Sequence, residues 1–315
     1  MIDLLLLLMA VFWGTNYAIV KHAFQEIEPQ AFNALRLTTA SLIFLTVMIA
    51  VRLRARGAAP ASKVFYTTAA VTSRDRWELV GLGLVGHCCY QYCFMAGLAR
   101  TSVANSSLMI GATPVLVALL SALLGIERIG RLHWLGAALS LGGIYLVVGQ
   151  GFALGSHGAL GDLLMFIAVC CWAIYTLGAR PLMKRHSPVG VTGMSMIVGT
   201  LMYLPLAWPS LRVTDWSRVS LQTWGWMLYS ATFALCVSYT IWYAGIRQLG
   251  VARTSTYSNF VPIVAMITAV TVLHEPLGWR KIIGAAAVLA GVALTRVGGQ
   301  RATVAPPVAE TPSCG

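Results

Sequence analysis

Two short segments, AGLARTSVA at residues 96–104 and AGIRQLGVA at residues 244–252, decide how this chain folds. Their Ala-Gly and Val-Ala pairs align without a gap at a constant separation of 148 residues. The same separation relates three further pairs: Pro114 and Pro262, Glu127 and Glu275, and Gly143 and Gly291. A fixed separation over this length indicates that the chain contains an internal duplication.

The duplicated segments lie in a chain whose composition suits a lipid environment. Of its 315 residues, 58% are hydrophobic and 10% are charged, whereas soluble domains carry roughly 25% charged residues. A bilayer core of about 30 Å needs about 20 apolar residues per helix. This rule predicts ten transmembrane helices, at residues 3–21, 30–51, 77–97, 103–124, 132–149, 159–178, 189–208, 223–245, 252–273 and 279–297.

Five of the predicted helices fall in each copy of the duplication. An odd number makes the second copy enter the membrane from the opposite side, so we predict an all-α membrane protein of two inverted five-helix repeats. The repeats are expected at residues 1–150 and 159–298, followed by a disordered cytoplasmic tail at residues 299–315. Trp13 and Trp172 are 159 residues apart, and we assign the eleven extra residues to the long loop 52–76.

The basic residues predict the orientation in the membrane. Fifteen of the 22 Lys and Arg residues fall in segments on the side of the N-terminus, six fall on the other side, and Arg36 lies within the second helix. The positive-inside bias therefore places both termini in the cytoplasm. We expect the chain to lie in the inner (plasma) membrane as a multi-pass protein. The net charge of +12 then reflects this bias, and no nucleic-acid partner is predicted.

The sequence lacks the motifs that ATP hydrolysis, metal binding and carboxylate-based ion coupling would need. The sequence has no phosphate-binding loop, so ATP does not drive this chain. Six of the seven cysteines lie in apolar runs without metal-ligand spacing, and we predict neither a metal nor another cofactor. No Asp or Glu falls near the middle of a predicted helix, so the usual carboxylate relay for protons or sodium has no obvious member.

The order and spacing of several short motifs resemble the EamA family of the drug/metabolite transporter superfamily. The resemblance covers residues 3–298 and rests on Trp13-Gly14 with Asn16, Arg36 with Ala40, residues 98–104 before Pro114, Glu127-Arg128, residues 249–252 before Pro262, Glu275-Pro276 and the glycine-rich fifth and tenth helices. It implies a central cavity lined by helices one, three, four, six, eight and nine. It also implies export or exchange of amino acids, sugars, nucleotides or related metabolites.

Polar and aromatic residues within the first and third helices are candidates for substrate binding. Near the middle of helix one, Asn16 and Tyr17 line a cavity or join neighbouring helices. In helix three, two pairs spaced by four residues share nearby faces and suit a zwitterion or an aromatic group: His87 with Gln91, and Tyr90 with Phe94.

His87 has two interpretations. Its unperturbed pKa lies near neutrality, so it is a candidate for proton coupling. We favour the alternative, a neutral histidine that is hydrogen-bonded to a backbone carbonyl.

The matched prolines predict a second group of candidates. Asn105 and Met109 precede Pro114, and Tyr257 and Asn259 precede Pro262. Interrupted helices at corresponding positions of two repeats point to a binding region, although a purely structural kink is the alternative.

Aromatic residues complete the candidates. Trp172 and Tyr175 in helix six and Tyr239 in helix eight lie deep enough to face a cavity. Aromatic residues near helix ends are more often anchors at the membrane surface, and this interpretation is given to Trp224, Trp226 and Trp242.

Three charged residues receive structural interpretations. Arg36 needs a partner, for which Glu26, Glu28 or an anionic substrate are options, and structural pairing is favoured. Glu127 and Glu275 occupy equivalent positions just past their helices and are expected to form loop hydrogen bonds or gates.

These features predict a secondary transporter of a small organic molecule such as an amino acid. A channel or a non-transporting receptor is the alternative. A membrane enzyme is disfavoured because the chain lacks a catalytic constellation at one depth. Small residues in helices five and ten permit close packing within one subunit or between two, which leaves a homodimer possible.

Overall fold

The computed structural model describes residues 2–55, 64–67, 69–123, 131–148, 157–249, 254, 257–276 and 278–302, and within these residues the chain is helical without strands. The first half contains α1 (Ile2–Ala23), α2 (Pro29–Arg54), α3 (Ser73–Leu82), η1 (Gly83–Cys89), α4 (Tyr90–Arg100), α5 (Val103–Gly111), α6 (Thr113–Leu123) and α7 (Arg131–Val148). The second half contains α8 (His157–Arg185), α9 (Pro188–Val213), η2 (Trp216–Arg218), α10 (Leu221–Tyr229), η3 (Ser230–Val237), α11 (Ser238–Leu249), α13 (Phe260–Leu273) and α14 (Trp279–Ala302).

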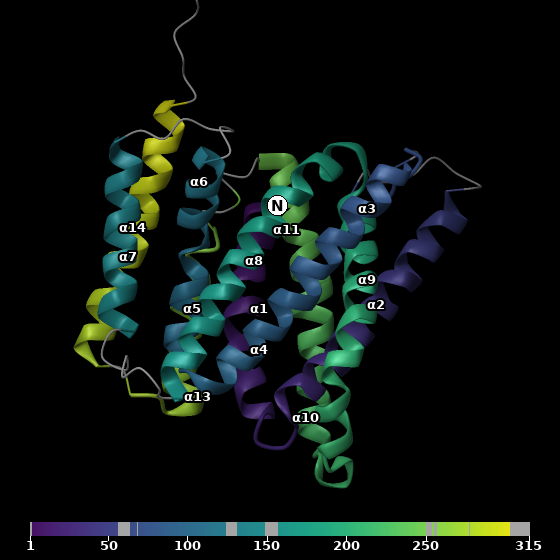
Figure 1. Cartoon of the computed structure of the whole chain (residues 1–315), viewed down its shortest axis with the longest axis horizontal. Coiled ribbons are helices and arrows are strands. Elements are labelled where there is room, and N and C mark those ends of the chain that lie inside the picture. Colours follow the sequence, from purple (N-terminus) through teal and green to yellow (C-terminus); the bar gives the residue numbers. More distant parts are fainter. Residues whose placement is uncertain are drawn as a thin grey trace, which may run out of the picture.

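These elements form the ten predicted membrane-crossing segments, because three segments are each built from consecutive helical pieces: α3–η1–α4, α5–α6 and α10–η3–α11. Five stretches are long and apolar enough to cross a bilayer by themselves: Ile2–Ala23, Pro29–Arg54, Ser73–Arg100, Gly158–Arg185 and Pro188–Val213. Figure 1 shows the segments running side by side between two ends of the molecule. The all-helical membrane fold is therefore confirmed.

Contacts between equivalent residues reveal the two-fold relation between the halves. The rings of Trp13 and Trp172 have centroids 6.1 Å apart, and the hydroxyls of Ser41 and Thr200 are 2.8 Å apart. Both pairs are separated by 159 residues in the sequence. Residues related by a two-fold axis touch each other only near that axis, so the axis passes between α1 and α8 and between α2 and α9.

The helices α7 and α14 are related by the same two-fold symmetry, and their equivalent residues are 148 positions apart in the sequence. A Cβ atom on Gly143 would lie 2.6 Å from the carbonyl oxygen of Gly284, and a Cβ atom on Gly291 would lie 2.5 Å from the carbonyl oxygen of Gly136. The pair lies at one side of the molecule (Figure 1). The small residues of these two segments therefore allow close packing within one subunit.

Matched irregularities interrupt other segments. The π-helical turns η1 and η3 occupy equivalent positions in the third and eighth segments, and such turns occur frequently at functional sites. The fourth segment breaks at Ala112, between α5 and α6, and a turn at Ser258 and Asn259 precedes α13. Pro114 and Pro262 thus fall in the first turn of a new helix, where a missing backbone N–H is tolerated.

Candidate functional site

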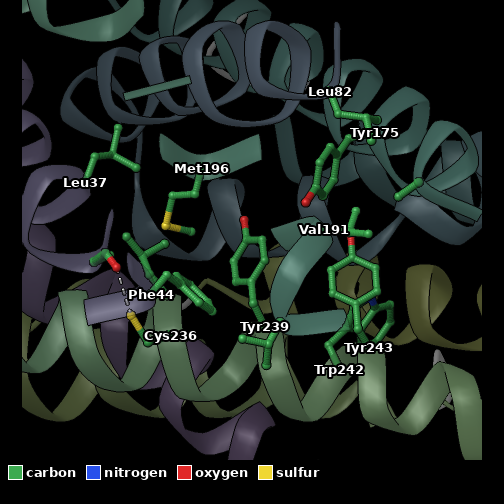
Figure 2. Packing of buried hydrophobic residues seen from close by; sticks show 14 of the residues in the cluster. Leu37, Phe44, Leu82, Tyr175, Val191, Met196, Cys236, Tyr239, Trp242 and Tyr243 are labelled. Atoms are coloured by element: carbon green, nitrogen blue, oxygen red, sulfur yellow. Dashed lines mark hydrogen bonds between the residues drawn. The ribbon is translucent and has the colours of Figure 1, made fainter. Parts of the chain in front are cut away.

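Ten ring-bearing side chains meet where the two halves face each other, and we call them the aromatic cluster. They come from α1, η1, α4, α8 and α11. Each ring contacts at least one other, and the centroids of the contacting pairs are between 5.1 and 6.3 Å apart. The members are Trp13, Tyr17, His87, Tyr90, Phe94, Trp172, Tyr175, Tyr239, Trp242 and Tyr243. In Figure 2, Tyr239, Trp242 and Tyr243 extend from one helix toward the helix that carries Tyr175.

Glycine allows one of these contacts. A Cβ atom on Gly86, within η1, would lie 2.2 Å from a ring carbon of Tyr175. The missing side chain lets the Tyr175 ring lie against the third segment, where it also contacts His87. The π-helical turn and its glycine therefore shape the aromatic cluster.

A polar cluster centred on Arg36 adjoins the aromatic one. The guanidinium donates to Oδ1 of Asn33 at 3.1 Å, to the hydroxyl of Ser230 at 3.0 Å and to Oε1 of Gln91 at 2.6 Å. Ser230 in turn donates to Oδ1 of Asn16 at 2.6 Å. Segments one, two, three and eight are thus joined around one positive charge.

Arg36 is 2% exposed, and its partners are all neutral. Glu26, which was one expected partner, instead accepts a hydrogen bond from the backbone N–H of Ser220 at 2.8 Å, and no ion pair between Arg36 and Glu28 is found. The expected structural ion pair of Arg36 is therefore absent among the described residues. The sequence could not show this, because the favoured partners are nearby in the chain whereas the observed ones come from segments three and eight.

His87 is buried and bonds to a side chain. Its Nε2 lies 3.2 Å from the hydroxyl of Tyr175, and its Nδ1 has no partner among the described residues. The partner is therefore a tyrosine hydroxyl and not the backbone carbonyl that we expected. Within the described structure, no carboxylate forms an ion pair with the ring.

The structure brings most of the predicted residues together. Nine of them belong to the two clusters: Asn16, Tyr17, His87, Tyr90, Gln91, Phe94, Trp172, Tyr175 and Tyr239. Met109, on α5, belongs to the same buried core as Tyr17 and Phe94.

Three predicted residues lie apart from these clusters. Asn105 is near the start of α5, where its amide lies 3.4 Å from the hydroxyl of Thr101. Tyr257 donates a hydrogen bond to Asp3 at the start of α1. Asn259 is a partly buried residue of the turn before α13.

The sequence reasoning missed other members of the clusters. Trp242 was interpreted as a membrane-surface anchor but is 4% exposed, because the helix carries it into the interface between the halves. Trp13, Tyr243, Ser230 and Asn33 were not proposed as site residues. A usable signal existed for Trp13, since it aligns with the candidate Trp172 at the repeat separation.

A buried carboxylate joins the two halves at one end of the molecule, where α3 begins. Asp75 bonds to the guanidinium of Arg185 at 2.6 Å and to Nε2 of His186 at 3.1 Å, which joins the first half to the second. Asp75 also accepts the backbone N–H of Thr72 and so completes a capping box on α3. We call this group the α3-end lock.

A second carboxylate joins the two halves at the opposite end, where α5 begins. Glu275 accepts the backbone N–H of Val103 at 2.9 Å and approaches that of Ala104 at 3.5 Å, in the first turn of α5. The positive end of the α5 dipole favours this contact. The hydroxyl of Thr101 donates a hydrogen bond of 2.6 Å to Oδ1 of Asp162 on α8. We call this group the α5-end lock; its Glu275 is the loop hydrogen-bonder that we expected, whereas Glu127 lies outside the described residues.

Comparisons with known proteins agree with this architecture. A model of the EamA-like transporter family matches residues 1–149 and again residues 159–297. The uncharacterized transporter YyaM of Bacillus subtilis is 27% identical over 92% of each chain. A chloroplastic WAT1-related protein of Arabidopsis thaliana is 26% identical over 90% of this chain and 66% of its own. A crystallised protein with 19% identity has a TM-score of 0.65 over 95% of this chain and 98% of its own, which shows a shared fold.

Proposed function

Because this chain belongs to the EamA-like transporter family and is a multi-pass membrane transporter, we propose that it exports or exchanges a small organic metabolite such as an amino acid. We propose that it does so by alternating access. In this mechanism the central clusters bind the substrate, and the two ends of the molecule open in turn.

The observation that carries the proposal is the position of the clusters between two locks. Arg36, His87 and Gln91 are each at most 2% exposed, so a substrate reaches them only after an end has opened. The α3-end lock and the α5-end lock each join the first half to the second through side chains. Breaking one lock while the other stays closed is the step that alternating access requires.

We propose an orientation in the inner membrane with both termini in the cytoplasm. The α3 end then faces the cytoplasm and the α5 end faces outward. The support is the excess of Lys and Arg in the segments on the side of the N-terminus.

The proposed function is tested by uptake into proteoliposomes that contain the purified protein. Labelled amino acids, nucleosides and sugars are offered with and without a pH gradient. We expect saturable uptake of one class, and we expect Asn16→Ala to lower it at least about tenfold at subsaturating substrate. The physical reason is that Asn16 accepts the hydrogen bond that positions Ser230 against Arg36.

Thr46→Ala is the matched control for this experiment. Thr46 is exposed on α2, and among the described residues its hydroxyl bonds to the carbonyl of Leu42 in its own helix alone, so its loss is expected to leave uptake unchanged. Uptake that never saturates would favour a channel. A folded, inserted protein that moves no class of compound would contradict the proposal.

A second prediction concerns proton coupling. We expect His87→Gln to retain uptake within about threefold of the unsubstituted protein, with the same dependence on external pH. The imidazole is buried without an ion-pair partner in the described structure, and a glutamine can replace its bond to Tyr175. Initial uptake rates between pH 5.5 and 8.5 check this expectation. Loss of gradient-driven uptake together with retained exchange would instead assign proton coupling to His87.

A further inference from the structure

We propose that Arg36 binds a carboxylate of the transported substrate, while the aromatic cluster receives an apolar or aromatic body on the same molecule. The inference rests on the proposed function, because it assigns the substrate class of the same site. Three features of the described residues support it: a buried positive charge without a counter-charge, a chemical difference between the two repeats and an unpaired indole N–H.

The first observation is a buried positive charge without a negative partner. Arg36 uses three of its five N–H groups on neutral acceptors, and the other two have no hydrogen-bond partner in the described parts of the chain. No carboxylate there forms an ion pair with it. A buried, unpaired charge costs several kcal/mol, whereas a neutral side chain could join the same helices at less cost. An anion that arrives with the substrate would supply the missing charge in bidentate geometry.

The second observation is that the repeats differ chemically where they face each other. The repeat separations make Ser195 the equivalent of Arg36, Thr192 that of Asn33, Tyr175 that of Asn16, and Tyr239 that of Gln91. At these four positions the first half carries a guanidinium and three amides, and the second carries hydroxyls and phenol rings, whereas the aromatic cluster as a whole takes five rings from each half. The positive charge of the site therefore belongs to the first half, whose equivalent position in the second half is Ser195. A molecule with a carboxylate at one end and an apolar body at the other matches this arrangement.

The third observation is independent of Arg36. Trp242 is 4% exposed, and its indole N–H has no acceptor among the described residues. The neighbouring Trp13 shows the usual arrangement, since its N–H donates to the carbonyl of Ala234 at 2.9 Å. This N–H within the aromatic cluster is free to donate to an oxygen atom of a bound molecule.

The test compares three compounds that share a phenylethyl body: 3-phenylpropionate, 2-phenylethylamine and 2-phenylethanol. Each is radiolabelled, and its binding to the purified full-length protein in detergent is measured by equilibrium dialysis. We expect 3-phenylpropionate to bind at least about tenfold more tightly than the amine and the alcohol, because only the carboxylate pairs with Arg36. L-Phenylalanine, which carries both charges, is expected to bind as the carboxylate does.

Gln91→Glu provides the sharper variant, because it places a carboxylate beside Arg36 without changing the size of the side chain. Gln91 already accepts a hydrogen bond from the guanidinium at 2.6 Å, so the new glutamate would supply the negative charge that the substrate otherwise brings. We expect this variant to unfold at a temperature no lower than that of the unsubstituted protein and to lose 3-phenylpropionate binding at least about tenfold. A purely structural Arg36 predicts no such loss. Arg36→Gln should also lose carboxylate binding, and Arg36→Lys should retain part of it.

Two results would overturn the inference while leaving the transporter in place. One is equal binding of the amine or the alcohol and the carboxylate, and the other is a folded Gln91→Glu variant that binds 3-phenylpropionate normally. Failure of the proposed function has a different signature, in which proteoliposomes transport none of the solutes in the uptake screen.

Discussion

Gly143→Leu is expected to remove most of the monodisperse protein that detergent extraction yields. A side chain at this position would meet the backbone of α14, since even a Cβ atom would lie 2.6 Å from the carbonyl oxygen of Gly284 and 2.7 Å from the backbone nitrogen of Val288. Backbone atoms cannot change rotamer, so the helices must separate. Overpacking costs about 1–3 kcal/mol even where side chains can adjust, and one or two kcal/mol changes the folded-to-unfolded ratio about 5–30-fold.

Gly142→Leu is the matched control, one residue away on the same helix. A Cβ atom on Gly142 would meet nothing within 4 Å, so a leucine there extends toward the lipid. Fluorescence-detected size-exclusion chromatography and the temperature of unfolding separate the two variants. Equal yield and equal unfolding temperatures would show that α7 and α14 do not pack as described.

The two locks should have opposite effects on access to the site. Asp75→Asn removes the charge that holds Arg185 and His186, so we expect it to favour the state open at the α3 end. Glu275→Gln weakens the contact with the first turn of α5, so we expect it to favour the state open at the α5 end. Each variant is expected to change the ratio of the two open states about tenfold, which is within the range of a single interaction broken in one state only.

The measurement uses one cysteine at the centre, introduced by Asn16→Cys after the native cysteines are replaced. A membrane-impermeant maleimide is added from either side of oriented vesicles. Asp75→Asn should raise the labelling rate from the cytoplasmic side in the proposed orientation, and Glu275→Gln should raise it from the outer side. Arg218→Gln is the control, since Arg218 pairs with Asp215 on the exposed turn η2, outside both locks. Faster labelling from the same side in both variants would refute the assignment of one lock to each end.

Much of the architecture was predictable from the sequence. The length of the apolar segments reflects the thickness of the membrane, and the constant spacing of matched residues reflects the duplication. The second predicted helix, 30–51, corresponds to Pro29–Arg54. The sixth was predicted to end at residue 178, yet α8 continues to Arg185 and passes through Pro181. A helix does not have to end where the hydrocarbon ends, so polar residues mark the membrane boundary better than the helix boundary.

The site was less predictable because its members gain their roles from residues far away in sequence. Arg36 bonds to Gln91 and Ser230, which lie 55 and 194 residues away, and no local pattern contains this information. Trp242 near the end of its segment has the pattern of a surface anchor, and only the packing of α11 against α1 and α8 makes it part of the aromatic cluster. The π-helical turns were also missed, since an apolar stretch does not reveal a change of hydrogen-bond register.

The contact between Ser41 and Thr200 has a mechanical consequence. These residues join α2 to α9 near the two-fold axis, so a rotation of one half against the other that is centred on this contact would displace them least. Arg36 is five residues from Ser41 along α2, about 7.5 Å at 1.5 Å per residue. The α3-end lock and the α5-end lock lie farther from this contact, at the two ends of the molecule. Such a rotation would separate Asp75 from Arg185 while moving the guanidinium much less, so an anion bound to Arg36 would stay bound while access passes from one side of the membrane to the other.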